Sequence, residues 1–121
     1  MKSENPLQQK SYAFAIRIVT LCQAIQNDKH EWTLSKQLLR AGTSIGANVE
    51  EAIGAQSEKD FYAKLCIVYK EARETHYWLR LLRDTNYLTF EQASSTIAEI
   101  DELLKITGSI LKTLKQKLAN S

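Results

Sequence analysis

The sequence predicts an all-α protein, an antiparallel up-down-up-down bundle of four helices. The chain has only one proline and four glycines in 121 residues, which is typical of long helices with few turns. Apolar residues recur at alternating spacings of three and four along four segments, as they do in helices that cross at a shallow angle. The connections between these segments are short, so consecutive helices are expected to run antiparallel.

The first helix is expected over residues 6–27. Asn5 is a favoured N-cap residue, and Pro6 suits the first helical position because the N–H that it lacks would be unpaired there anyway. The apolar residues that follow have the spacing of one helix face: Phe14, Ile18, Leu21 and Ile25. The polar residues 27–30 end this helix.

The second helix is expected over residues 34–56. Its apolar stripe is Leu34, Leu38, Ala41, Ile45, Asn48 and Ala52. The stripe places Asn48 in the interior, where a single buried asparagine commonly fixes the register of a bundle. Thr75 and Thr107 interrupt the stripes of the later helices, so we expect a polar layer made of these three side chains.

Residues 41–54 of the second helix read AGTSIGANVEEAIG and hold three of the four glycines. Glycine costs a helix interior about 1 kcal/mol relative to alanine, so these glycines need a structural reason. Small residues spaced by four allow another helix to approach closely, and the strip here is Gly42, Gly46, Glu50 and Gly54. We expect a close helix contact on this strip. Ser44 is expected to be a packing residue, and Glu51 to bond a neighbouring helix or a partner subunit.

The third and fourth helices are expected over residues 58–85 and 90–118. Ser57 is a suitable N-cap for the third helix, and Thr89 with Gln92 forms a capping box at the start of the fourth. The third apolar stripe is Phe61, Leu65, Val68, Ala72, Thr75, Leu79 and Leu82. The fourth is Phe90, Ala93, Ile97, Ile100, Leu104, Thr107, Leu111, Leu114 and Leu118.

Length and composition indicate one globular domain over residues 1–121. Hydrophobic residues make up 44% of the chain and charged residues 25%, which is typical of soluble proteins. The longest uncharged run, residues 18–27, is far too short to span a bilayer. No secretory leader pattern opens the chain, so we expect a cytoplasmic protein without a membrane partner. Cys22 and Cys66 are expected to be buried free thiols rather than a disulfide.

Residue patterns that support catalysis are scarce. A di-iron bundle needs Glu-x-x-His on two helices, but the residues three positions before His30 and His76 are Asn and Arg. Glu71 and Glu74 lie one turn apart, as a pair of acid–base groups would. A solvated or salt-bridged face is the favoured interpretation, because lysine and arginine adjoin them. We therefore expect no enzyme, no metal and no cofactor.

Basic residues recur along three of the expected helices. Spacings of seven and ten residues align them on single faces: Lys10 and Arg17 on the first helix, Arg73, Arg80 and Arg83 on the third, and Lys105, Lys112 and Lys115 on the fourth. Beyond Glu102 the chain has no acidic side chain. Such clusters neutralise phosphates in nucleic-acid-binding proteins, but they equally suit a solvated helix face. Both interpretations stay open.

Two aromatic residues, Tyr77 and Trp78, are adjacent in the third helix. Adjacent helical residues point about 100° apart, so both cannot face one core. We expect Trp78 to be exposed at a subunit contact, where tryptophan is enriched. A wide buried face explains the pair equally well.

The run SIGANVEEAIGAQSEKDFYAKLCIVYKEARETHYWLRLL resembles the four-helix bundle proteins encoded within intervening sequences of 23S ribosomal RNA genes. The Ser-Ile-x-x-Asn-x-x-Glu pattern of that family is matched by Ser44, Ile45, Asn48 and Glu51. Its aromatic-rich third helix is matched by Glu-Thr-x-Tyr-Trp-Leu at residues 74–79. The resemblance covers nearly the whole chain and implies a four-helix bundle.

This family is similar to the accessory variability protein of diversity-generating retroelements. That protein is a ring-shaped pentamer of four-helix bundles, which binds nucleic acid on a basic surface and works with a reverse transcriptase. The resemblance therefore implies a homo-oligomer, with a pentamer as the expected ring. It also implies RNA, a ribonucleoprotein or a reverse-transcriptase-like protein as partner. The net charge of only +2 is a departure, since it dilutes the positive surface of a strong nucleic-acid binder.

Two functions follow as hypotheses. The first is a non-enzymatic, oligomeric bundle that binds structured RNA or an RNA–protein complex through the eight basic residues named above. The second is a protein-interaction scaffold or adaptor without nucleic-acid binding. Reversing the charges of Arg80 and Lys112 distinguishes them, because this change weakens RNA binding and leaves protein interactions largely intact.

Overall fold

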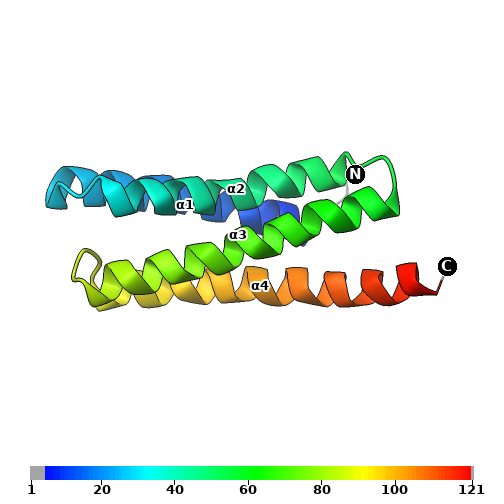
Figure 1. Ribbon diagram of the computed structural model, residues 1–121. Helices are drawn as coiled ribbons and strands as arrows, with labels where there is room; N and C mark the ends of the chain where they lie inside the picture. The colour runs from blue at the N-terminus through cyan, green and yellow to red at the C-terminus, as the bar shows by residue number, and fades with distance from the viewer. Residues whose placement is uncertain (1–4, 121) are drawn as a thin grey trace.

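Four long helices make up the computed structural model, which describes residues 5–120. They are α1 (Pro6–Lys29), α2 (Thr33–Ile53), α3 (Glu58–Asp84) and α4 (Phe90–Ala119). Successive helices run antiparallel, so α1 begins and α4 ends toward the same side of the molecule (Figure 1). The predicted all-α four-helix bundle is confirmed. The domain predicted over residues 1–121 includes residues 1–4 and 121, which lie outside the described part.

Three helices begin at the capping residues that the sequence predicts. The Asn5 side chain accepts a hydrogen bond from the backbone N–H of Gln8 (3.1 Å), and Ser57 Oγ accepts one from the N–H three residues further on (3.0 Å). Thr89 and Gln92 form the reciprocal bonds of a capping box, at 3.1 and 2.9 Å. Each cap satisfies N–H groups that the first helical turn cannot pair internally.

The start of α2 is stabilised by a side chain that was not predicted. Trp32 occupies the N-cap position and makes no side-chain hydrogen bond there. The Glu31 carboxylate instead accepts bonds from the backbone N–H groups of Thr33, Leu34 and Ser35, at 3.0, 2.9 and 2.8 Å. A negative charge at a helix start is also favoured by the helix dipole. Glutamate is not among the residues that prefer the N-cap position, so its capping signal is weak in the sequence.

Two helix ends differ from their predicted positions. α1 continues to Lys29 instead of ending at residue 27. It stops where His30 adopts the left-handed conformation (φ 54°) and donates its backbone N–H to the carbonyl oxygen of Gln26. α2 ends at Ile53 instead of residue 56, and Gly54 caps it. The ends of α3 and α4 lie within one residue of those predicted.

The four apolar stripes meet in one core. Its largest fully buried side chains include Phe14, Ile18, Leu38, Ile45, Leu65, Leu79, Leu82 and Ile100. Three expectations are wrong. Asn48 is only half-buried, because α2 turns Val49 inward instead. Phe90 is 74% exposed, because it precedes the first buried turn of α4. Cys22 is buried as expected, but Cys66 is exposed, and both thiols are free.

The expected polar layer is not formed. Thr75 and Thr107 are fully buried, but the Thr75 hydroxyl donates to the backbone carbonyl of Glu71 (2.8 Å). The Thr107 hydroxyl has no hydrogen-bond partner among the described residues. The Asn48 amide donates to the carbonyl of Ser44 in its own helix (2.8 Å). Such bonds to a carbonyl four residues earlier are common for these residue types within helices.

The glycine strip of α2 packs against α1 of the same chain. A Cβ atom at Gly42 would lie 2.9 Å from two side-chain carbons of Ile18. One at Gly46 would lie 3.3 Å from the backbone oxygen of Ser11. Both distances are shorter than ordinary van der Waals contacts, so the approach of the two helices depends on glycine. Gly54 lies in open surroundings, with no atom nearer than 3.8 Å.

Contacts are most extensive between α2 and α3 and least extensive between α1 and α4. In Figure 1, α1 and α2 lie together on one side of the molecule, and α3 crosses between them and α4. Within residues 5–120, none of the helices combines the length and the apolar character that a membrane span requires.

Candidate functional site

Two of the eight predicted basic residues, Lys10 and Arg17, are engaged by carboxylates of the same chain. Lys10 Nζ lies 3.2 Å from Glu102 Oε2. Arg17 pairs with Glu99. Both pairs join α1 to α4, and a phosphate at either cation would have to compete with the carboxylate. Lys10 and Arg17 are therefore weak candidates for binding an anion.

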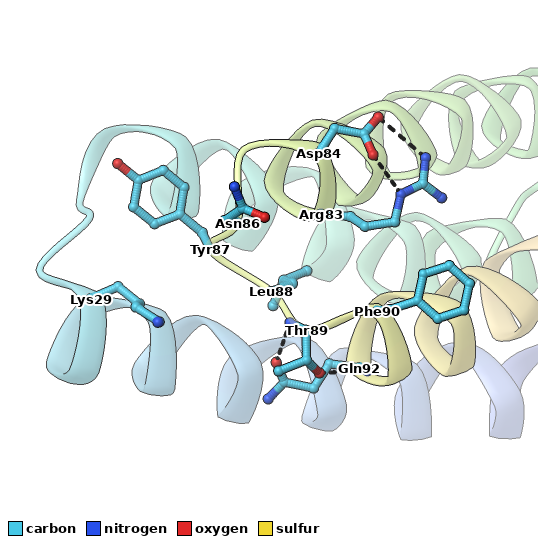
Figure 2. Close-up of a pocket in the computed structure, with 9 residues that line it drawn as sticks. All are labelled: Lys29, Arg83, Asp84, Asn86, Tyr87, Leu88, Thr89, Phe90 and Gln92. Carbon is cyan, nitrogen blue, oxygen red and sulfur yellow. Dashed lines mark hydrogen bonds and ion pairs between the residues drawn. The ribbon is translucent and has the colours of Figure 1, made fainter.

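Arg83 is also paired, at the end of the bundle where α3 turns into α4. Figure 2 shows it bonded to Asp84, with Nε–Oδ1 and Nη2–Oδ2 distances of 2.8 and 3.3 Å. This hydrogen bonding lowers the pKa of the Asp84 carboxyl group. The hollow drawn in the figure also contains the capping box of α4 and Lys29 from α1. Most polar groups there are already paired, so little remains to orient a ligand.

The other five predicted cations lie on two adjacent helices: Arg73 and Arg80 on α3, and Lys105, Lys112 and Lys115 on α4. We call these five residues the α3/α4 face. None of them forms an ion pair with another residue between positions 5 and 120. Lys105 and Lys112 are seven residues apart and so share one side of α4. The structure thus separates the predicted set into three paired cations and five unpaired ones.

A hollow between α3 and α4 brings the arginines of this face together. It is lined by Arg73, His76, Arg80, Asp101 and Leu104. His76 Nε2 lies 3.3 Å from Asp101 Oδ1. Asp101 also lines a neighbouring hollow, together with Glu99, Glu102 and Lys105. The arginines of α3 and the first lysine of α4 therefore border the same region, and Lys105 has carboxylates beside it.

Tyr69 of α3 and Gly108 of α4 meet at the boundary between these two helices. The ring of Tyr69 would lie 3.4 Å from a Cβ atom added at Gly108. The glycine therefore lets α3 present this half-buried ring directly against the backbone of α4. Tyr69 was not among the predicted site residues, although its position four residues before Arg73 is visible in the sequence.

The exposed member of the aromatic pair is Tyr77, so the expectation for Trp78 is wrong. Tyr77 is 49% exposed, whereas Trp78 packs against the core. Trp78 Nε1 also donates a hydrogen bond to Glu74 Oε2 (2.9 Å) on the same helix. The two rings meet edge to face, with centroids 5.0 Å apart and an interplanar angle of 73°. The Arg80 guanidinium carbon lies 5.9 Å from the Tyr77 ring centroid.

Glu71 and Glu74 are bound by an arginine rather than arranged for acid–base chemistry. Arg40 of α2 pairs with both, at 3.3 Å to Glu71 Oε1 and more closely to Glu74. Glu71 is only 8% exposed, so its charge needs this partner. The arrangement matches the salt-bridged face favoured from the sequence, and it connects α2 to α3.

The remaining candidates on α2 make local contacts. Ser44 Oγ donates to the carbonyl oxygen of Arg40 (2.6 Å). Glu51 pairs with Lys64 of α3 at 2.9 Å, and this hydrogen bond raises the pKa of the Lys64 amine. Of the two partners expected for Glu51, the structure supplies the neighbouring helix. Gly42, Gly46 and Asn48 belong to the contacts described above.

The sequence did not predict an exposed apolar surface that the structure shows on α1. Tyr12, Ile16 and Val19 follow one another at spacings of four and three and are all exposed, Tyr12 by 67% and Ile16 by 54%. A hollow between α1 and α2 adjoins Tyr12 and is lined by small residues that include Gly46 and Ala47. In the sequence, these residues adjoin the core stripe of the same helix, so the two stripes look like one broad apolar face. We call Tyr12, Ile16 and Val19 the α1 stripe.

Across the part of the chain that the structure describes, no three His, Cys, Asp or Glu side chains are placed to share an ion.

Comparison with known proteins identifies the family. The model of the 23S rRNA-intervening sequence protein family matches residues 3–109, and the chain belongs to this family. A solved structure from Bacteroides thetaiotaomicron, described as a protein with unknown function from the S23 ribosomal protein family, is 50% identical. The match covers 88% of this chain and 98% of that one, with a TM-score of 0.86. A search of curated proteins found none that matches.

Proposed function

We propose that this protein is a non-enzymatic, oligomeric bundle that binds RNA through the α3/α4 face. The proposal rests on which of the predicted cations already have an ion-pair partner. Three of the eight predicted basic residues are paired, and the five that have no ion pair within residues 5–120 lie on two adjacent helices. Unpaired lysines and arginines gathered on one surface neutralise phosphates without first losing an intramolecular partner.

The charge distribution along α4 supports the same surface. Its first half contains Glu91, Glu99, Asp101 and Glu102, and no acidic residue follows. Glu99 and Glu102 pair with α1 cations and also line the hollow that contains Lys105. The carboxylates of α4 are thus confined to the part of the helix that precedes Lys105, Lys112 and Lys115. A mild net charge of +2 is therefore compatible with one locally cationic surface.

Binding to folded RNA, single-stranded RNA and duplex DNA tests the proposal. The wild-type chain is compared with the double variant Arg80→Glu, Lys112→Glu at low and near-physiological salt. We expect wild-type protein to bind RNA at low salt and the double variant to bind at least tenfold more weakly. Absence of wild-type binding at low salt would overturn the proposal.

A matched control separates position from total charge. The double variant Lys29→Glu, Lys36→Glu changes the net charge by the same amount at exposed residues outside the α3/α4 face. We expect it to bind RNA within about threefold of wild type, because attraction between exposed charges weakens beyond a Debye length of about 8–10 Å. An equal loss in both double variants would indicate non-specific attraction in place of a defined surface.

Self-association is the second part of the proposal, and the α1 stripe supports it. Large exposed apolar residues that follow one helix face are typical of protein interfaces. The 23S rRNA-intervening sequence family resembles ring-forming bundles, so we propose a second copy of this chain as the occupant and a pentamer as the assembly. If RNA binding is absent, the same stripe supports the alternative function, a protein-interaction scaffold.

Light scattering on the purified chain measures the number of subunits. We expect a particle larger than the 13.8 kDa monomer, and a smaller particle for Ile16→Glu, which places a charge in the α1 stripe. Ser94→Glu, at an exposed position on α4, is the control and should leave the size unchanged. A monomeric wild-type chain would contradict self-association.

A further inference from the structure

We infer that the α3/α4 face recognises unpaired nucleotides, with Tyr77 as the surface on which one base stacks. This inference rests on the proposed function and names the class of RNA that it binds. The Tyr77 ring is half exposed, yet its neighbours on the helix surface are Arg73, four residues before it, and Arg80, three residues after it.

The Tyr77 ring is held in place by a chain of contacts that begins on another helix. Arg40 of α2 fixes Glu74 by an ion pair, and Glu74 accepts the indole N–H of Trp78 at 2.9 Å. Trp78 in turn meets Tyr77 edge to face, with centroids 5.0 Å apart. An aromatic ring that is fixed before binding loses little conformational freedom when a base stacks on it.

Charges on both sides of the ring supply contacts for the sugar–phosphate backbone. Arg73 and Arg80 line the same hollow between α3 and α4 and are separated by about 10 Å along the helix axis. The Arg80 guanidinium lies over the ring, 5.9 Å from its centroid, where it also offers a cation–π contact. One aromatic surface flanked by two cations is the combination that binds single strands, in which bases stack on rings and phosphates meet lysine or arginine.

Duplex RNA does not fit this arrangement. Its bases are stacked inside the helix, and its major groove is too deep and narrow for side chains to read. Tyrosine and arginine are also common at protein interfaces, but Tyr77 lies between two arginines that line the hollow of α3 and α4 and not in a run of exposed apolar side chains such as the α1 stripe. The ligand that fits this surface is therefore a single-stranded segment, such as a loop or an end of a folded RNA.

Two substitutions at one position test the role of the ring. Tyr77→Leu removes the aromatic ring and keeps an apolar side chain that is compatible with a helix, whereas Tyr77→Phe keeps the ring. The probes are oligouridine, a strand of equal length without bases, and an RNA duplex, all measured at one salt concentration. We expect Tyr77→Leu to bind oligouridine roughly tenfold more weakly than wild type. Tyr77→Phe should bind it like wild type.

The other probes separate this inference from the proposed function. The strand without bases should bind wild type and Tyr77→Leu equally, because it offers phosphates and no base to stack. Equal affinity of wild type and Tyr77→Leu for oligouridine would overturn the role of Tyr77 and leave RNA binding by the basic face intact. If wild type binds none of the probes, the proposed function itself fails. Circular dichroism of each variant confirms that the fold is unchanged.

Discussion

Among the four glycines, Gly42 lies at the closest approach between two helices. A Cβ atom there would lie 2.9 Å from Cγ1 and Cγ2 of Ile18, and Ile18 is fully buried. A β-branched side chain has few rotamers available in a helix, so Ile18 has no easy way to move aside. The glycine is retained against its low helix propensity because a larger residue would separate α1 from α2.

Gly42→Ala is expected to lower the free energy of unfolding by roughly 1–2 kcal/mol. Overpacking a core typically costs about 1–3 kcal/mol, and the better helix propensity of alanine offsets part of that cost. Denaturant unfolding at fixed protein concentration measures the change. Gly54→Ala is the control, because its nearest atoms lie at 3.8 Å, and it should stay within about 0.5 kcal/mol of wild type. A stabilised Gly42→Ala variant would contradict the close contact.

Thr107 has a fully buried hydroxyl group. Its hydroxyl oxygen makes no hydrogen bond with any described residue, and an unsatisfied buried polar group costs roughly 1–3 kcal/mol. Thr107→Val replaces the hydroxyl by a methyl group of similar shape and should raise the free energy of unfolding by about 1 kcal/mol. Thr75→Val removes a hydroxyl that is hydrogen-bonded to Glu71 and should give no such gain. Equal losses in both variants would contradict this difference.

The two cysteines are expected to differ in reactivity. Burial raises the pKa of the Cys22 thiol to about 12, whereas Cys66 is exposed. Because the thiolate is the reactive form, iodoacetamide at pH 8 should label Cys66 and spare Cys22 in the folded protein. Mass spectrometry should detect one label per chain in buffer and two in denaturant. Comparable labelling of both thiols in buffer would show that Cys22 is not protected.

At the scale of secondary-structure elements, the network around Arg40 links α2 to α3. Arg40→Met leaves the Glu71 carboxylate buried without its cation and is expected to lower the free energy of unfolding by roughly 1–3 kcal/mol. This range is below that of fully buried pairs, because Arg40 is half exposed. The double variant Arg40→Met, Glu71→Gln removes the unpaired charge and should recover much of the loss. No recovery in denaturant unfolding would mean that packing by Arg40 dominates over its charge.

The helices themselves were largely predictable from the sequence, because periodic apolar residues and strong capping residues act locally. Asn5, Ser57 and Thr89 each cap the helix that they precede. Predictions failed where the outcome depends on the neighbouring helices. The spacing of Asn48 fits the α2 stripe, yet the observed rotation of α2 buries Val49. The spacing of Phe90 fits the α4 stripe, yet this residue precedes the first buried turn of α4 and is exposed.

The candidate site was predictable only in its composition. The basic residues were visible in the sequence, but their partners are not neighbours along the chain. Arg17 and Glu99 come from α1 and α4, and their pairing depends on the tertiary arrangement. Likewise, the adjacent Tyr77 and Trp78 fitted either one exposed ring or a wide buried face, and only the structure shows that Tyr77 is exposed while Trp78 packs against the core.

For the whole molecule, we expect the α3/α4 face to neutralise phosphates as a unit. Its five cations are divided between two helices, so neither helix alone supplies all of the positive charge. If all five contact a single-stranded RNA, the logarithm of the affinity should fall against the logarithm of salt concentration with a slope of about −3.5. The slope depends on the number of phosphates that are neutralised, so it is a more direct test than an affinity measured at one salt concentration.

The measurement to make first is therefore the salt dependence of single-stranded RNA binding, between about 50 and 200 mM salt. Wild type is compared with Arg80→Glu, Lys112→Glu and with the control Lys29→Glu, Lys36→Glu. Joint neutralisation of phosphates by the α3/α4 face predicts a steep slope for wild type and the control, and a slope shallower by at least about 1.4 units for the first variant. No RNA binding at low salt, or one common slope for all three proteins, would contradict it.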